Sequence, residues 1–145
     1  MIRANTPGYK DIYCICQNSD ESDEAVILIV KSSWAGDIAL AQFKEDGYQP
    51  RDYKLASIRN WMVDGAELDL SIMHVTSDGE AWFDEGRTRA IVAHEKGFKD
   101  YPIATTRRHA LRLKDHWGSV SGAKKKFDFT YCWELDDSAL ILGNL

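Results

Sequence analysis

Between Ser71 and Thr105, short apolar runs are separated by glycine-containing breaks. Asp78-Gly79 divides two strand-like runs, which is typical of a tight hairpin turn. Gly97 follows a run with helical spacing, as a C-terminal cap does. The pattern predicts strands at 71–75 and 80–83, a helix at 88–96 and a strand at 101–105. A chain with this order of elements is expected to combine a sheet with packed helices.

The rest of the chain extends the same type of fold. The segment 18–24 is too acidic to bury, and it separates predicted strands at 11–17 and 25–31, which we expect to pair as an antiparallel hairpin. Further predicted elements are helices at 34–43 and 53–63, a basic helix or loop at 106–114, and a late strand at 127–135. Because 44% of the 145 residues are hydrophobic, the chain can bury a real core. We therefore expect one α+β domain over residues 1–145, with a small mixed sheet.

Charge and cysteine content exclude several classes of protein. The net charge of -5 argues against a generally basic nucleic-acid binder, although a local basic patch is still compatible with it. Cys14, Cys16 and Cys132 have neither the spacing of a zinc site nor the even number of a disulfide framework, so we expect free thiols in a reducing cytosol. The N-terminus lacks the apolar core of a signal peptide, and the longest apolar run, 25–30, is too short to span a bilayer. We expect a cytoplasmic protein without membrane insertion.

The most suggestive polar residues follow the second strand of the predicted hairpin. Asp84 and Glu85 precede Gly86, and the predicted helix then opens with Arg87-Thr88-Arg89. A glycine lets the backbone approach a ligand closely, and the first N–H groups of a helix point toward an anion. Arginines at a helix N-terminus oppose the macrodipole, and a bound phosphate would relieve that repulsion. The sequence predicts a phosphate site at 86–89, where the Thr88 hydroxyl either contacts the phosphate or caps the helix locally.

The two acids of this segment have two interpretations. Asp84 and Glu85 could themselves supply the negative charge that the arginines need, which would make the group structural. Alternatively, they could hold a divalent metal such as Mg²⁺ that arrives with a nucleotide, because carboxylates are its preferred ligands. We expect no metal site built from the protein alone.

Two further basic segments could contact phosphates. Arg107 and His109 lie in a basic run and are candidates for a second phosphate contact, although a solvated helix face explains them as well. The lysines at 124–126 precede an aromatic run and could form a surface for single-stranded nucleic acid. Lysines also protect edge strands from aggregation, and the net acidity of the chain favours that explanation.

The segment 83–90, continued by 94–103, resembles the ParB/sulfiredoxin-like superfamily. The hallmark is a strand, a Gly-x-x-Arg turn, a helix ending at glycine, and a strand opening with proline, and Gly86 and Arg89 fit the turn. The arrangement of Asp84, Gly86, Arg87 and Arg89 is most similar to plasmid fertility inhibition proteins of the Osa and FiwA type. The match covers residues 71–105, about a quarter of the chain.

The resemblance implies binding of nucleotide or nucleic-acid phosphate at the Gly-x-x-Arg turn. Sulfiredoxins need a cysteine directly after the glycine, and Arg87 stands there, so their reductase chemistry is not expected. The partition proteins carry Glu and Arg at the two middle positions, where this chain has Arg87 and Thr88. The chain also lacks the length for their DNA-binding and dimerisation domains, so their clamp-forming role is not expected.

Three functions are compatible with the sequence, and the first of them is implied by the resemblance alone. The first is fertility inhibition: the protein would block conjugative transfer by acting on the transfer machinery or its coupling protein, with ATP or another nucleotide bound. The second is a small nucleotide hydrolase or a metal-dependent nuclease acting on DNA, in which Asp84, Glu85 and Arg89 would be catalytic with Mg²⁺. No separate general base is evident for such an enzyme. The third is a binding module whose aromatic surface contacts a protein partner.

Overall fold

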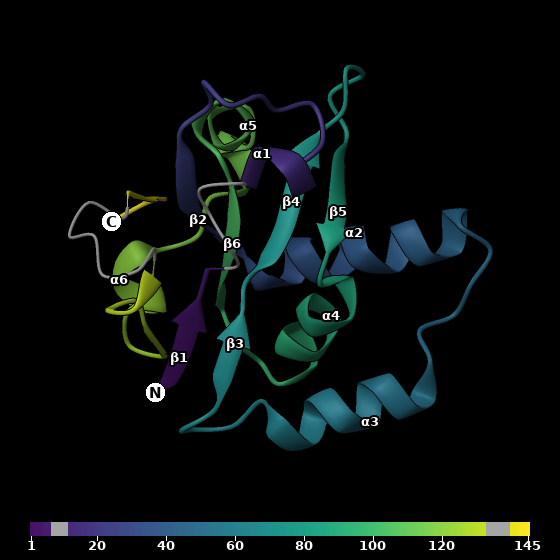
Figure 1. Cartoon of the computed structure of the whole chain (residues 1–145). Helices are drawn as coiled ribbons and strands as arrows, with labels where there is room; N and C mark the ends of the chain where they lie inside the picture. The colour runs from purple at the N-terminus through teal and green to yellow at the C-terminus, as the bar shows by residue number, and fades with distance from the viewer. Residues whose placement is uncertain (7–11, 133–139) are drawn as a thin grey trace.

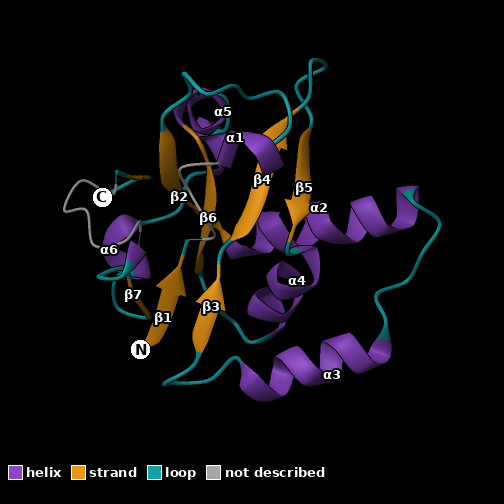
Figure 2. Cartoon of the chain, in the orientation of Figure 1, coloured by secondary structure: helices purple, strands orange, loops and turns teal. Residues whose placement is uncertain are grey.

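The computed structural model describes residues 1–6, 12–132 and 140–145 (Figure 1). Its helices and strands are distributed along the whole of the described chain (Figure 2). The strands are β1 (Ile2–Asn5), β2 (Ala25–Lys31), β3 (Glu67–Asp69), β4 (Ser71–Val75), β5 (Ala81–Glu85), β6 (Asp100–Thr106), β7 (Phe127–Asp128) and β8 (Ile141–Leu142). The helices are α1 (Ile12–Ile15), α2 (Ser32–Glu45), α3 (Asp52–Trp61), α4 (Arg87–Glu95), α5 (Arg107–Leu111), the 3-10 helix η2 (Lys114–His116) and α6 (Val120–Ala123). The predicted α+β class is confirmed.

The larger sheet is mixed and has the strand order β5-β4-β6-β2-β8. β5 pairs with β4 and β2 pairs with β6 in antiparallel fashion, while β4 runs parallel to β6 and β8 runs parallel to β2. A second sheet contains β3, β1 and β7 in parallel. Every residue of the central strand β6 is buried. β5, which leads into α4, is an edge strand, so this connection lies at the rim of the main sheet.

Helices α2 and α4 pack directly on each other beside this rim. A Cβ added at Gly36 of α2 would lie 2.9 Å from the Cβ of His94 on α4, which is too close for any larger residue. Gly36 therefore lowers helix propensity but permits close helix packing. Ala90 and Ala93 of α4 are fully buried, so small residues also line the inner face of that helix.

Helix α3 lies outermost, next to α4 (Figure 1). None of its residues is fully buried, so the hydrophobic core alone does not fix its position. Arg59 of α3 donates two hydrogen bonds of 2.8 Å to the carboxylate of Glu95, and the Lys96 ammonium donates to the Arg59 carbonyl at 2.7 Å and to the Met62 carbonyl at 2.9 Å. These polar contacts join α3 to the C-terminal end of α4, in addition to the partly buried Leu55, Ile58 and Trp61, which pack against the core.

Some predicted elements match the structure closely, and others are wrong. The strands predicted at 25–31 and 71–75 coincide with β2 and β4. The predicted strand at 11–17 is wrong because residues 12–15 form α1 (residue 11 lies outside the described residues), and the antiparallel partner of β2 is therefore β6. Ile12 and Cys16, four residues apart, are both buried, which is the spacing of a helix face.

The predicted strand at 127–135 is also too long. Only residues 127–128 form β7, and a turn follows, while residues 133–135 lie outside the described part of the chain. β7 contains only two residues because the Asp128 side chain accepts a hydrogen bond of 2.9 Å from the Thr130 N–H, which favours a turn over an extended strand.

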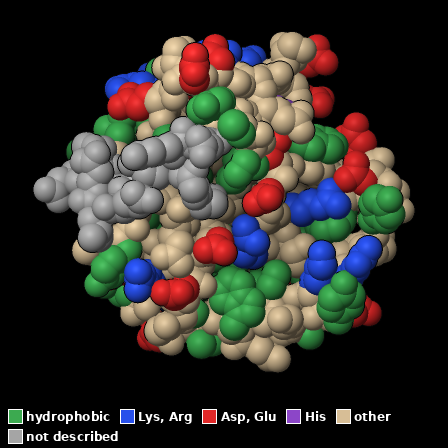
Figure 3. Space-filling view, viewed as in Figure 1, with side chains coloured by type: hydrophobic (Ala, Val, Ile, Leu, Met, Phe, Trp, Pro, Cys, Tyr) green, Lys and Arg blue, Asp and Glu red, His purple; other side chains and the backbone are tan. Residues whose placement is uncertain are grey.

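Three further properties of the described residues relate to the sequence predictions. Cys14, Cys16 and Cys132 are free thiols, as expected. No helix in the described segments has both the length and the apolar character needed to cross a membrane. Figure 3 shows acidic and basic side chains interspersed over the face it presents, rather than one continuous basic surface.

Candidate functional site

The connection from β5 to α4 presents an open helix N-terminus. Gly86 is the N-cap residue and has φ 84° and ψ 20°, a left-handed conformation that glycine adopts readily. The first helical hydrogen bond runs from the Ala90 N–H to the Gly86 carbonyl at 3.2 Å, so the N–H groups of residues 87–89 precede it. Within the described chain no side chain caps this helix, and its first turn contains no acid. The N-terminus of α4 therefore keeps its capacity to bind an anion.

The floor beneath Gly86 consists of buried polar groups. The Ser71 hydroxyl donates to the Gly86 carbonyl at 2.8 Å and is 2.7 Å from the Tyr101 hydroxyl. A Cβ added at Gly86 would collide with the Ser71 side chain and would lie 2.6 Å from Nη2 of Arg89. The glycine is therefore required both by its backbone angle and by the close approach of this floor.

The Arg89 side chain turns back toward this floor. Burial raises the pKa of Tyr101, and the hydrogen bond with Ser71 together with the charge and hydrogen bond of Arg89 partly oppose that effect. Nε of Arg89 is buried without a hydrogen-bond partner, and none of the ion pairs among the described residues includes Arg89. Among the described residues, the Arg89 guanidinium thus has no carboxylate within ion-pair distance.

A groove of about 700 Å³ opens in front of this helix end. It is lined by segment 82–89, by α2 at Gln42 and Phe43, by the loop at Tyr48 and Gln49, and by α3. The groove contains four cationic side chains, Arg51, Lys54, Arg87 and Arg89, against two carboxylates, Asp84 and Glu85. The groove is therefore locally basic in a chain whose net charge is -5.

Arg87 is fixed at the wall of the groove rather than at its centre. Its guanidinium donates to Oδ2 of Asp46 at 2.6 Å, and it lies 3.7 Å from the centre of the Phe43 ring. Both charged side chains are partly exposed, so solvent screens the pair. Asp46 thus offsets much of the charge of Arg87, which leaves Arg89, Arg51 and Lys54 as the cations available to an anion.

The two acids that the sequence singled out occupy different environments. His74 donates from Nδ1 to Oδ2 of Asp84 at 3.0 Å, and the side chains of both residues are only 3% exposed. Burial raises the pKa of Asp84, while the neighbouring His74 partly opposes that effect. Glu85 is exposed on the rim of the groove. Glu85 is therefore the carboxylate of this pair that is accessible from solvent.

Arg107 and His109 are not among the residues that line the groove. Arg107 is exposed and pairs with Glu24 at 3.1 Å. His109 is buried: its Nδ1 accepts from the Val75 N–H at 3.1 Å, and its Nε2 is 3.1 Å from the Ser19 hydroxyl. Both ring nitrogens are thus used inside the protein, and burial lowers the pKa of His109. A second phosphate contact by His109 is incompatible with this geometry.

Residues 124–126 directly precede β7, which is an edge strand of the smaller sheet. This position suits lysines that guard a strand edge. For metal binding, the described residues include no group of three or more His, Cys, Asp or Glu side chains that could hold an ion.

Sequence reasoning located 84–89 but missed the opposite wall of the groove. Lys54 belongs to α3 and Arg51 directly precedes that helix, and no local pattern relates them to Gly86. Gln42 of α2 was also missed: its side chain accepts from the Phe83 N–H and donates to the Phe83 carbonyl, both at 2.8 Å, which covers the edge of β5. His74, the partner of Asp84, could have been found from the sequence. The turn at 78–79 sets the hairpin register that places His74 opposite Trp82, and Asp84 follows Trp82 by two residues, so its side chain lies on the same face of the strand.

Comparison of the chain with models of protein families, with curated proteins and with solved structures found no match.

Proposed function

We propose that this protein binds the phosphates of a nucleotide, such as ATP, in the groove at the N-terminus of α4. The observation that carries the proposal is the guanidinium of Arg89, without an ion-pair partner among the described residues, beside an uncapped helix end. Helix N–H groups and arginine together are a common means of binding phosphate in proteins. Arg51, which directly precedes α3, and Lys54 of α3 add positive charge to the lining of the groove.

The cellular role that we propose for this binding is inhibition of conjugative transfer, by contact with the transfer machinery or its coupling protein. This part rests on the resemblance of the Gly-x-x-Arg turn to plasmid fertility inhibition proteins. A mating assay in cells that express the chain tests it: transfer frequency should fall with the wild-type chain and recover with Arg89→Met. Unchanged transfer in the presence of folded wild-type protein would contradict this role without affecting the binding proposal.

Binding itself is tested by calorimetry with inorganic tripolyphosphate, which presents the phosphates without a base. Arg89→Met should weaken binding about tenfold or more, since a hydrogen bond to a charged group contributes about 1.5–3 kcal/mol. Lys54→Met should also weaken it, and because Lys54 is exposed, its loss should not disturb folding. Arg107→Met is the matched control, because this arginine is exposed, pairs with Glu24 and lies outside the groove.

Two results would refute the binding proposal. One is the absence of tripolyphosphate binding at low salt, where electrostatic attraction is strongest. The other is an equal loss of affinity in Arg107→Met and Lys54→Met, which would indicate nonspecific attraction by surface charge.

The same samples test for turnover. Glu85 is the exposed carboxylate of the groove and is therefore the residue on which water or nucleotide-bound Mg²⁺ could be oriented. If the protein hydrolyses nucleotides, Glu85→Gln should abolish phosphate release while preserving tripolyphosphate affinity. Phosphate release that is unaffected in Glu85→Gln would exclude Glu85 from catalysis.

A further inference from the structure

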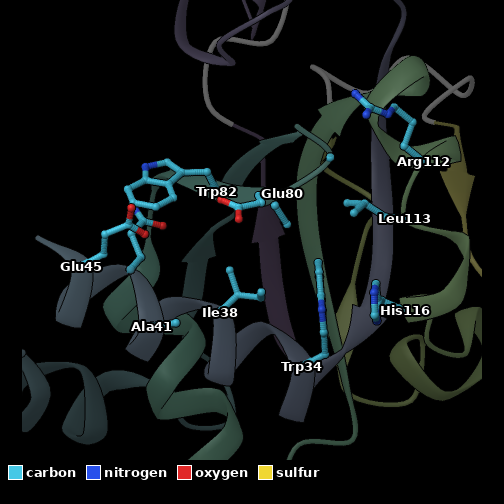
Figure 4. Close-up of a pocket in the computed structure, with 12 residues that line it drawn as sticks. Trp34, Ile38, Ala41, Glu45, Glu80, Trp82, Arg112, Leu113 and His116 are labelled. Atoms are coloured by element: carbon cyan, nitrogen blue, oxygen red, sulfur yellow. The ribbon is translucent and has the colours of Figure 1, made fainter. Parts of the chain in front are cut away.

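A second cavity, of about 380 Å³, adjoins the phosphate groove. We call it the Trp34 cavity; its walls come from α2, from the hairpin segment 79–82 and from the segment 112–116 (Figure 4). This volume is in the range of small-molecule sites. The proposed binding of phosphates in the groove does not involve this cavity.

The cavity presents a flat aromatic surface. The rings of Trp34 and His116 are stacked, with their centres 4.5 Å apart and their planes 7° from parallel. Figure 4 shows His116 on one side of the Trp34 ring and Ile38 on the other side, toward the interior of the cavity. His116 therefore fixes the orientation of the indole, whose second face lies toward the cavity. A planar ring stacked on that face would meet apolar side chains at Ile38 and Leu113.

The rim of the cavity is more acidic than basic. Glu45 and Glu80 contribute carboxylates, and Arg112 contributes one guanidinium, which donates to the Thr76 carbonyl at 3.3 Å. Carboxylates accept hydrogen bonds from amino groups and repel phosphates. The rim therefore suits a ring that carries an amino group, and it disfavours the phosphate end of the same ligand.

The two cavities are neighbours along β5. Trp82 and Gln42 line both of them, and the lining residues of β5 run from Ala81 in the Trp34 cavity to Glu85 in the groove. Four steps along a strand correspond to about 13 Å. This is a span that a nucleoside polyphosphate can cover with its ring at one end and its phosphates at the other.

We infer that the Trp34 cavity binds the base of the nucleotide whose phosphates occupy the groove, with an amino-bearing base stacked on Trp34. The inference rests on the proposed function, and it adds the residues that distinguish a nucleotide from an inorganic phosphate. The acidic rim at Glu45 and Glu80 and the basic groove at Arg51 and Lys54 give the ligand one orientation.

The experiment compares ATP with inorganic tripolyphosphate under the same Mg²⁺ concentration. We expect ATP to bind at least tenfold more tightly to the wild-type protein, and Trp34→Leu to reduce this ratio to less than threefold. Ile38→Trp, which fills the cavity without removing the indole, should have the same effect. Trp61→Leu is the control, because Trp61 is a half-buried tryptophan that lines neither cavity.

Inosine triphosphate tests the acidic rim, since it replaces the adenine amino group with a carbonyl. It should bind less tightly than ATP, and Glu80→Gln should reduce that difference. Equal affinities for ATP and tripolyphosphate in the wild-type protein would overturn the inference while the proposed function stands. Adenosine binding without tripolyphosphate binding would refute the proposed function and support an aromatic-ring site, and binding of neither would refute both.

Discussion

Substitution of Gly86 by alanine tests the geometry beneath the phosphate groove. The left-handed backbone at φ 84° costs an alanine about 1–2 kcal/mol. The new Cβ would also collide with the Ser71 side chain, which is fully buried on β4 and cannot move aside, and this adds about 1–3 kcal/mol. The nearby end of Arg89 is flexible and can shift. Gly86→Ala should therefore lower the free energy of unfolding by about 2–5 kcal/mol.

Gly97→Ala is a matched control for this prediction. Gly97 has φ 77°, but a Cβ added there would meet nothing within 4 Å, so only the conformational cost of about 1–2 kcal/mol applies. The measurement is urea denaturation of the two variants and the wild-type protein. In a Ser71→Gly background the cost of Gly86→Ala should fall toward that of Gly97→Ala. If Gly86→Ala and Gly97→Ala differ by less than about 0.5 kcal/mol in the wild-type background, the close approach of Ser71 is refuted.

Three further predictions concern the described contacts. Gln42→Ala should lower the free energy of unfolding by about 2–4 kcal/mol, because the Phe83 N–H and carbonyl lose buried partners; a loss below about 1 kcal/mol in urea would contradict this. Burial lowers the pKa of His109 in the folded protein below its unfolded value of about 6.5. The resulting contribution to stability is complete above pH 6.5 and is lost as the pH falls through the folded pKa. His109→Gln should therefore flatten the pH dependence of Tm below pH 6.5. Arg59→Ala should lower the free energy of unfolding by only about 1 kcal/mol or less, since its ion pair with Glu95 is exposed. A much larger loss in urea denaturation would show that the position of α3 depends on this pair.

Several parts of the fold were predictable because the determining interactions are local. The strand at 71–75, the turn at 78–79, the helix ending before Gly97 and the strand at 25–31 each depend on residues within a few positions of one another. The position of Gly86 between strand and helix follows for the same reason. Short-range patterns of this kind are visible in a sequence without knowledge of the neighbouring elements.

The errors arose where a short apolar segment had no local feature to decide its structure. Residues 12–15 fit a strand by composition, but they form a helix that buries Ile12, and β2 pairs with the distant β6 instead of with them. The segment after residue 128 turns because a side chain–backbone hydrogen bond replaces the ladder of a sheet. In both cases a competing contact outweighed a weak propensity.

The sequence by itself determined that Gly86 ends a strand and begins a helix, and that arginines occupy the first turn of that helix. Only the tertiary structure decided which charges face the groove. It pairs Arg87 with Asp46, turns Arg89 toward Tyr101, holds Asp84 on His74 and brings Lys54 across from α3. The physical reason is that the orientation of a long charged side chain depends on its nearest neighbours in space, and those neighbours lie up to tens of residues away in the chain.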